Sequence, residues 1–193
     1  VAVAIVGSRR ASIYGLETSE KLGFELAARG VTVISGMAIG IDSAAHKGAL
    51  KAKGRTIAVM GGGHNCIYPS QNKKLYEEIA SSGAVITEYE DDAAPLAQQF
   101  PARNRIISGL SLGVVIVEAA KNSGALITAN FAAEQGRTVF AVPGKVSSHT
   151  SSGTNELIKD GAALVQSIDD ILQELSIAET GPDSEEPGNA LGE

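Results

Sequence analysis

Short apolar runs alternate with helix-forming stretches along most of this chain, and the alternation restricts the folds open to it. The runs lie at residues 2–6, 31–34, 56–60, 84–87, 114–117, 138–142 and 162–165. Helices are expected at 12–29, 41–53, 71–81, 103–110, 125–135, 155–160 and 169–175, and a loop with one helical turn at 88–99. Strands that return through helices lie parallel. The pattern therefore predicts an α/β fold: a doubly wound, mostly parallel sheet with helices on both faces.

Composition predicts one folded domain followed by a tail. The 193 residues are 44% hydrophobic, which suffices for a full core, and we place the domain at 1–175 and an acidic, flexible linker at 176–193. The single cysteine, Cys66, excludes an internal disulfide and favours a reducing cytoplasm. No apolar run approaches the roughly 20 residues of a membrane span. Because the chain opens directly on a strand, without a signal peptide, we expect it to start inside a longer protein.

The net charge of −6 argues at first against nucleic acid, but the charge is unevenly distributed. Five acidic residues and no Lys or Arg follow Ser176. The remaining chain is close to neutral, so a nucleic-acid site would be a local basic patch.

Glycine-rich turns follow the predicted strands, and topology brings them together. In a parallel sheet every turn from strand to helix lies at the carboxyl edge, where ligands bind. These turns contain Gly7, Gly36, Gly61 to Gly63, Gly124 and Gly144, and Arg9, Lys121 and Lys145 accompany three of them. Backbone N–H groups and cations at one edge favour a phosphate-bearing ligand. The alternative is that the glycines only permit tight turns.

Several common chemistries are excluded. The first strand ends without the G-x-G-x-x-G of a dinucleotide site and no phosphate-binding P-loop sequence occurs, so no cofactor is expected. Ser111 lies in a G-x-S-x-G sequence but follows a helix and precedes a strand, which is the wrong order for a nucleophile. His46, His64 and His149 lack metal-ligand spacing, so no metal site is expected.

Three acid–base candidates are given structural roles. Asp42 and His46 are four residues apart on one helix, a spacing that serves local hydrogen bonding more often than catalysis. Glu118 ends a strand and is expected to accept hydrogen bonds from neighbouring turns, with a catalytic acid as the alternative. No catalytic residue is predicted.

Seven motifs occur along the chain in a fixed order. They are Gly7-Ser8-Arg9; Ser35-Gly36-Met37-Ala38 with Gly40, Ile41, Asp42, Ala45 and His46; Tyr68-Pro69 with Asn72; Phe100-Pro101 with Arg103 to Ser111; Val117-Glu118-Ala119 with Ser123, Gly124, Thr128 and Ala129; Pro143-Gly144; and Gly153 with Asn155, Leu157 and Ile158. In this order and spacing they resemble the bacterial DNA-processing protein A family (DprA, also called Smf), over about residues 1–165.

The resemblance implies an extended Rossmann-like domain that binds single-stranded DNA. Members of the family protect incoming strands during natural transformation, help load the recombinase RecA, act as homodimers in the cytoplasm and are not known as enzymes. Members often carry an N-terminal helical module and a C-terminal winged-helix module, and neither is recognised in this sequence.

The resemblance also implies a set of DNA-binding residues. Arg9 and Arg105 would contact phosphates, Arg103 would do the same or brace the pocket, and Phe100 would stack on a base. Ser8, Gly36 and Ala38 would let the strand approach the backbone. Asn104, Ser123 and Gly124 belong to the same motifs, and Lys145 is added because its turn lies at the carboxyl edge.

Two other functions stay open at this point. One is a nucleotide-cleaving enzyme of the phosphoribohydrolase class, but its Pro-Gly-Gly-x-Gly-Thr turn is replaced here by Glu118-Ala-Ala-Lys-Asn-Ser-Gly124. The other is a Rossmann-like protein that binds a small nucleotide.

Overall fold

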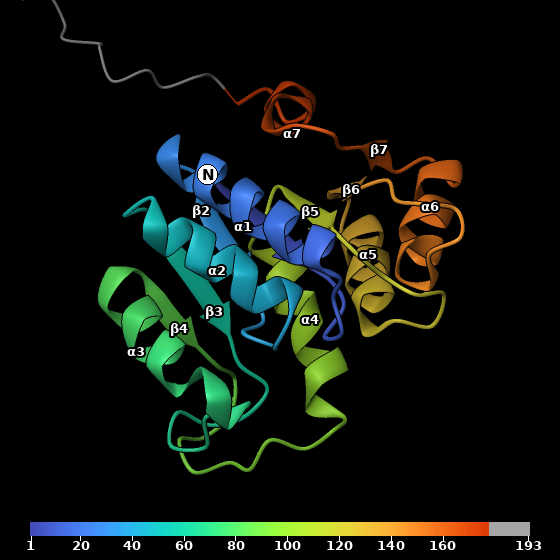
Figure 1. The fold of residues 1–193 in the computed structure, drawn as a ribbon. Coiled ribbons are helices and arrows are strands. Elements are labelled where there is room, and N and C mark those ends of the chain that lie inside the picture. The colour runs from blue at the N-terminus through green and yellow to red at the C-terminus, as the bar shows by residue number, and fades with distance from the viewer. Residues whose placement is uncertain (178–193) are drawn as a thin grey trace, which may run out of the picture.

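The computed structural model describes residues 1–177, and within them seven strands form one sheet in which every neighbouring pair is parallel. The strand order is β4-β3-β2-β1-β5-β6-β7 (Figure 1). The strands are β1 (Ala2–Val6), β2 (Thr32–Ser35), β3 (Thr56–Val59), β4 (Ala84–Ile86), β5 (Gly113–Ile116), β6 (Thr138–Ala141) and β7 (Ala163–Leu164). The predicted fold class is confirmed. The predicted tail lies outside the described residues, apart from 176 and 177.

The helices also follow the predicted order. They are α1 (Ile13–Ala28), α2 (Ile41–Lys51), α3 (Lys73–Ser82), α4 (Gln99–Gly109), α5 (Gly124–Glu134), α6 (Ser152–Lys159) and α7 (Ile168–Glu174), with 3-10 turns η1 (Ser70–Asn72) and η2 (His149–Ser151). No helix within residues 1–177 is long and apolar enough to cross a membrane.

The start of α4 differs from the prediction. The helix begins at Gln99, four residues before the expected start at 103, and residues 88–98 form a loop without the expected helical turn. Pro101 is tolerated because it lies in the first turn, where backbone N–H groups have no partner within the helix.

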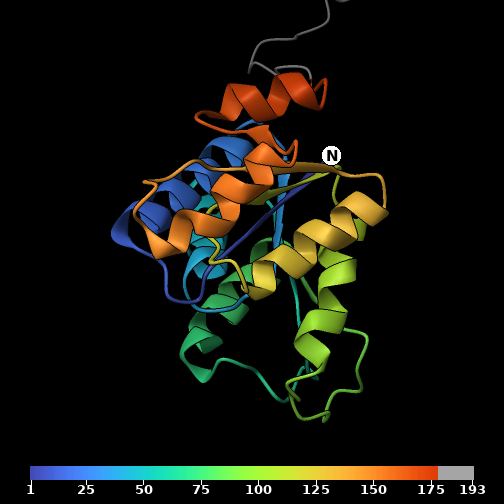
Figure 2. The same cartoon turned by 90° about the vertical axis from the view of Figure 1, so that its right-hand side faces the viewer.

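Helices cover both faces of the sheet. Figure 2 shows α1 and α2 on the left of the strands and α4 and α5 on the right. On the first face α1, α2 and α7 bury a cluster with β1, β2, β5 and β6, and α3 adds a smaller cluster beside β3. On the second face α4 and α5 pack against alternate residues of the same strands. This two-sided burial explains why the strands read as unbroken apolar runs.

The chain reverses direction across the sheet between β1 and β5. From β1 it proceeds through β2 and β3 to β4, and then crosses back to β5 on the other side of β1. The turns after β1 and β5 therefore lead away from each other at the carboxyl edge. Open α/β sheets bind ligands in the crevice at such a point.

Glycines let α1 and α2 pack unusually closely. A β-carbon at Gly48 would collide with the carbonyl oxygen of Glu20, and one at Gly23 would collide with that of Ala45. Close packing of α2 on α1 fixes the start of α2, which borders the turn after β1.

His46 is a neutral core residue. Thr56 donates its hydroxyl to the Val33 carbonyl (2.8 Å), so it accepts from Nδ1–H of His46 (2.7 Å). Nε2 is buried without a partner, and protonating it would place a charge there. Burial, aided by the Arg103 guanidinium, therefore lowers the pKa of His46 to about 3.

We expect Gly48→Ala to lower the free energy of unfolding by about 1–3 kcal/mol, the usual cost of overpacking, although alanine is the better helix former. Urea unfolding measures the change. The control is Gly109→Ala in α4, where the nearest atom would be 3.8 Å away and stability should not fall. Equal stability of the two variants would contradict the close helix contact.

His46 makes the free energy of unfolding depend on pH, and the sign of the effect follows from its lowered pKa. The unfolded chain binds a proton near the ordinary pKa of 6.5, whereas folded His46 stays neutral down to about 3. Below pH 6.5 its contribution to stability therefore falls, by up to about 1.4 kcal/mol per pH unit. We expect His46→Gln to have a shallower loss of stability between pH 7 and 5 in urea unfolding. Parallel curves would contradict the buried neutral state.

Candidate nucleic-acid interface

The turn after β1 presents Arg9 at the carboxyl edge. The Ser8 N–H donates to the Glu118 carbonyl (2.8 Å), and the Ile41 N–H donates to the Ser8 carbonyl (3.2 Å). Gly40, at a φ of 85°, lies so close that a β-carbon there would collide with the Ser8 carbonyl. The turn is therefore fixed between β5 and α2, while the Arg9 side chain remains exposed.

The Glu118 carboxylate ties three segments together, as predicted. It accepts hydrogen bonds from the N–H (2.8 Å) and hydroxyl (2.6 Å) of Ser12, which caps α1, and from the Thr150 hydroxyl (3.0 Å) in η2. Glu118 is 2% exposed. A negative charge at the amino end of α1 is also favoured by the helix dipole.

Arg103 is buried and bridges the ends of two strands. Its Nη1 donates to the Gly36 carbonyl after β2 (2.9 Å) and to the Val59 carbonyl of β3, and the residue is 4% exposed. Burial lowers the pKa of Arg103 to about 10, against the effect of the Asp42 carboxylate, so the side chain keeps its charge at neutral pH. Of the two predicted roles, bracing and phosphate contact, this geometry favours bracing.

Asp42 holds the turn after β2 from inside. Its carboxylate accepts from the N–H groups of Gly36 (3.1 Å) and Ala38 (3.4 Å). Burial raises the pKa of Asp42, and the Arg103 guanidinium opposes this rise. A β-carbon at Gly36 would lie within 2.8 Å of both charged groups, so only glycine fits between them. Asp42 and His46 thus share a helix but bond to different partners.

Arg9 meets an aromatic pair. Its guanidinium carbon lies 5.3 Å from the centre of the Phe100 ring, within the range of a cation–π contact. The Tyr68 ring lies 5.4 Å from that of Phe100, tilted by 47°. The structure therefore brings the first and fourth motifs together. It also adds Tyr68, which belongs to the third motif and was not predicted to bind DNA.

Arg105 lies elsewhere on α4. Two residues after Arg103, it points to a different side of the helix, and both Glu88 carboxylate oxygens accept from its Nη2 (2.5 and 2.6 Å). About half of each side chain is exposed. Its charge is thus balanced by an acidic neighbour.

The remaining predicted residues form two further groups. Asn104 donates to the Gly124 carbonyl (3.4 Å), and Ser123 caps α5 by accepting from the Ala125 N–H (3.3 Å). A β-carbon at Gly124 would meet nothing within 4 Å, so the surface there is open. Lys145 is exposed in the turn after β6, next to Val146, which is 97% exposed.

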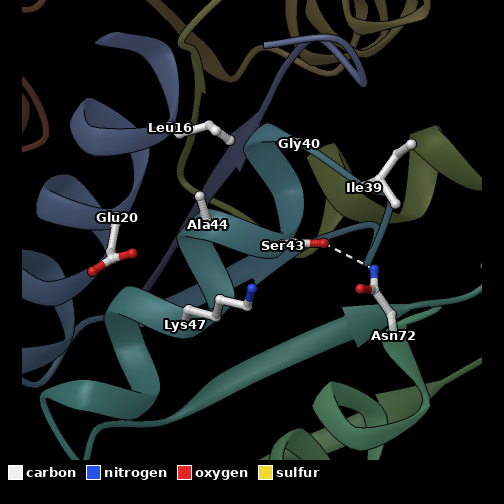
Figure 3. A pocket seen from close by; sticks show the side chains of 8 residues that line it. All are labelled: Leu16, Glu20, Ile39, Gly40, Ser43, Ala44, Lys47 and Asn72. Atoms are coloured by element: carbon white, nitrogen blue, oxygen red, sulfur yellow. Dashed lines mark hydrogen bonds between the residues drawn. The ribbon is translucent and has the colours of Figure 1, made fainter. Parts of the chain in front are cut away.

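A separate hollow of about 260 Å³ lies between α1 and α2 (Figure 3). Leu16 and Glu20 line it from α1, and Asn72 closes one end; the other wall consists of Ile39, Gly40, Ser43, Ala44 and Lys47. None of the predicted DNA-binding residues lines it. The candidate interface is therefore separate from this hollow. Within the described residues no group of His, Cys, Asp and Glu could hold a metal ion.

Three similar proteins, one matched by sequence and two by structure, carry the names Smf or DNA processing protein A. Protein Smf of Escherichia coli K12 is 49% identical over 174 residues, which are 90% of this chain and 46% of that protein. The X-ray structure of DNA processing protein A (DprA) from Streptococcus pneumoniae has 45% identity and a TM-score of 0.84, and the match covers 90% of this chain and 61% of that one. DNA processing protein A from Helicobacter pylori, described for its single-stranded DNA binding mode, has 35% identity and a TM-score of 0.83, over 91% and 80%.

These matches confirm the resemblance seen in the sequence motifs. The chain spans about half the length of the Smf protein it matches. Residues 1–176 fit the family model described as DNA recombination-mediator protein A. The chain therefore belongs to the DNA recombination-mediator protein A family, to which its Smf and DprA relatives point as well.

Proposed function

We propose that this chain binds single-stranded DNA without catalysing a reaction, and that it serves DNA processing in natural transformation. The observation that carries the proposal is the exposed Arg9 held against Phe100 at the carboxyl edge. A cation beside a ring suits a strand whose phosphates and bases are both accessible. The single-stranded DNA binding mode described for the H. pylori relative supports the same ligand.

Arg9 and the aromatic pair, Phe100 and Tyr68, contact different parts of the strand. Arg9 attracts the phosphate, and the rings offer a stacking surface that accepts any base. Neither contact reads base edges, so binding should be largely independent of sequence. Lys145 and the amino end of α5 at Ser123 and Gly124 provide further contacts for the backbone of the strand.

The fixed residues of the site support a binding role over a catalytic one. The Glu118 carboxylate already accepts three hydrogen bonds, and Asp42 is buried against two backbone amides. Neither carboxylate is free to act on a substrate. Release of free base from a nucleoside monophosphate, lost in Glu118→Gln, would instead support the phosphoribohydrolase alternative, and a thermal shift with mononucleotides would support the small-nucleotide alternative.

The wider cellular role extends the same proposal. Protection of incoming strands, RecA as partner, a homodimer and a cytoplasmic location rest on the family resemblance. They are properties of full-length family members, and this chain covers 46% of the Smf protein of Escherichia coli and 58% of the DprA of Bacillus subtilis.

The first test is fluorescence anisotropy of a labelled oligo-dT at two salt concentrations, with duplex DNA of equal length as competitor. We expect binding that weakens with salt and is poorly competed by the duplex. Arg9→Ala should weaken binding and reduce the magnitude of the salt slope by about 0.7, the value for one phosphate on a single strand. The control Lys21→Ala removes an exposed charge from α1 and should change neither quantity. Absence of binding at low salt would refute the proposal.

The Arg105–Glu88 pair gives a second prediction. If Arg105 contacts phosphate, DNA must compete with Glu88, so Glu88→Gln should tighten oligo-dT binding by about 2- to 5-fold, in line with the strength of an exposed ion pair. The double variant Glu88→Gln/Arg105→Ala should lose this gain. Arg105→Ala alone should change the Kd less than Glu88→Gln does, because Glu88 already balances the charge of Arg105. Tighter binding that persists in the double variant would show that Glu88 acts only by repelling DNA.

A further inference from the structure

The Phe100 ring is already largely occupied in this structure. Arg9 lies over it, Tyr68 lies beside it, and Gly61 packs so closely that a β-carbon there would be 2.9 Å from the ring. Phe100 is only partly exposed, whereas 49% of Tyr68 is exposed. Of the two rings, Tyr68 therefore presents the larger free surface to a base.

Tyr68 is held by an anchored segment. Four residues later, buried Asn72 donates to the Met37 carbonyl (2.8 Å) and to the Ser43 hydroxyl (2.8 Å). Figure 3 shows the Ser43–Asn72 bond at the end of the hollow. These bonds tie the turn before α3 to the turn after β2, so little conformational freedom remains to be lost when a base stacks on the ring.

The charges around Tyr68 separate bases from phosphates. Just before it, Asn65 bonds to the carboxylate of Asp92 (2.8 Å) and to the Asp91 carbonyl, so the preceding segment lies against an acidic loop. On the Phe100 side of the aromatic pair, Arg9 places its positive charge over the ring. A phosphate is repelled on the first side and attracted on the second, whereas an uncharged base is accepted between them.

We propose that Tyr68 is a base-stacking residue for single-stranded DNA, with Phe100 supporting its ring and Arg9 holding the adjoining phosphate. This inference rests on the proposed function and adds to it one binding residue and the orientation of the bound strand. Bases lie on the Tyr68 side of the aromatic pair, and the backbone lies on the Arg9 side.

Substitution tests the ring. Tyr68→Ala should raise the Kd for oligo-dT by about 5- to 150-fold, the effect of removing one stacked base, while Tyr68→Phe should bind like the parent protein. The matched control is Phe24→Ala, which removes a similarly exposed aromatic residue (44%) from α1 and should leave the Kd within about 2-fold. Circular dichroism checks that each variant is folded.

Intrinsic fluorescence gives a second measurement that does not depend on affinity. The chain has no tryptophan and four tyrosines, so its emission comes from tyrosine. Stacking on a base should quench part of that emission as oligo-dT is added. Tyr68→Phe should bind with the parent Kd but lose most of the quenching.

The outcomes separate this inference from the function on which it rests. Parent-like binding by Tyr68→Ala, or undiminished quenching in Tyr68→Phe, would overturn the role of Tyr68 while leaving single-stranded DNA binding intact. A parent protein that does not bind oligo-dT would overturn both. A weakened Tyr68→Ala together with a tight but unquenched Tyr68→Phe would establish the stacking residue.

Discussion

The guanidinium of Arg103, buried between the ends of β2 and β3, is the interaction on which the candidate interface depends. A buried charge is costly unless it is paired and hydrogen-bonded, and here two strand-end carbonyls and the nearby Asp42 carboxylate meet that requirement. The bond network fixes α4 across the carboxyl edge of the sheet. Because Phe100 lies about one turn earlier on the same helix, the position of its ring follows from this buried contact.

The Glu118 carboxylate performs the same task on the other half of the edge. It joins the end of β5 to the amino end of α1 and to η2. The backbone carbonyl of Glu118 accepts from the Ser8 N–H and so holds the turn that carries Arg9. The exposed cations are therefore carried by turns whose backbones are already hydrogen-bonded. Binding to such a preorganised surface loses less conformational entropy than binding to mobile loops.

Sequence alone was sufficient for the sheet and the order of its helices, because both depend on local periodicity. It could not separate the roles of Arg103 and Arg105, two identical side chains two residues apart. Their surroundings depend on how α4 packs, and α4 begins earlier than its sequence suggested. Tyr68 was missed for the same reason, since its neighbour Phe100 lies on a distant segment and only tertiary packing joins the two rings.

The charge balance of the chain sets how such an interface can bind a polyanion. Of the three arginines predicted to contact DNA, Arg103 is buried and Arg105 is paired with Glu88, so only Arg9 is exposed without an acidic partner in an ion pair. With few phosphate contacts, electrostatic attraction alone gives weak binding that salt easily reverses. Stacking adds affinity that does not depend on charge, and duplex DNA cannot use it because its bases are already stacked. Preference for single strands would then arise from the rings, and the near neutrality of the surface would sharpen that preference by reducing binding to duplex DNA.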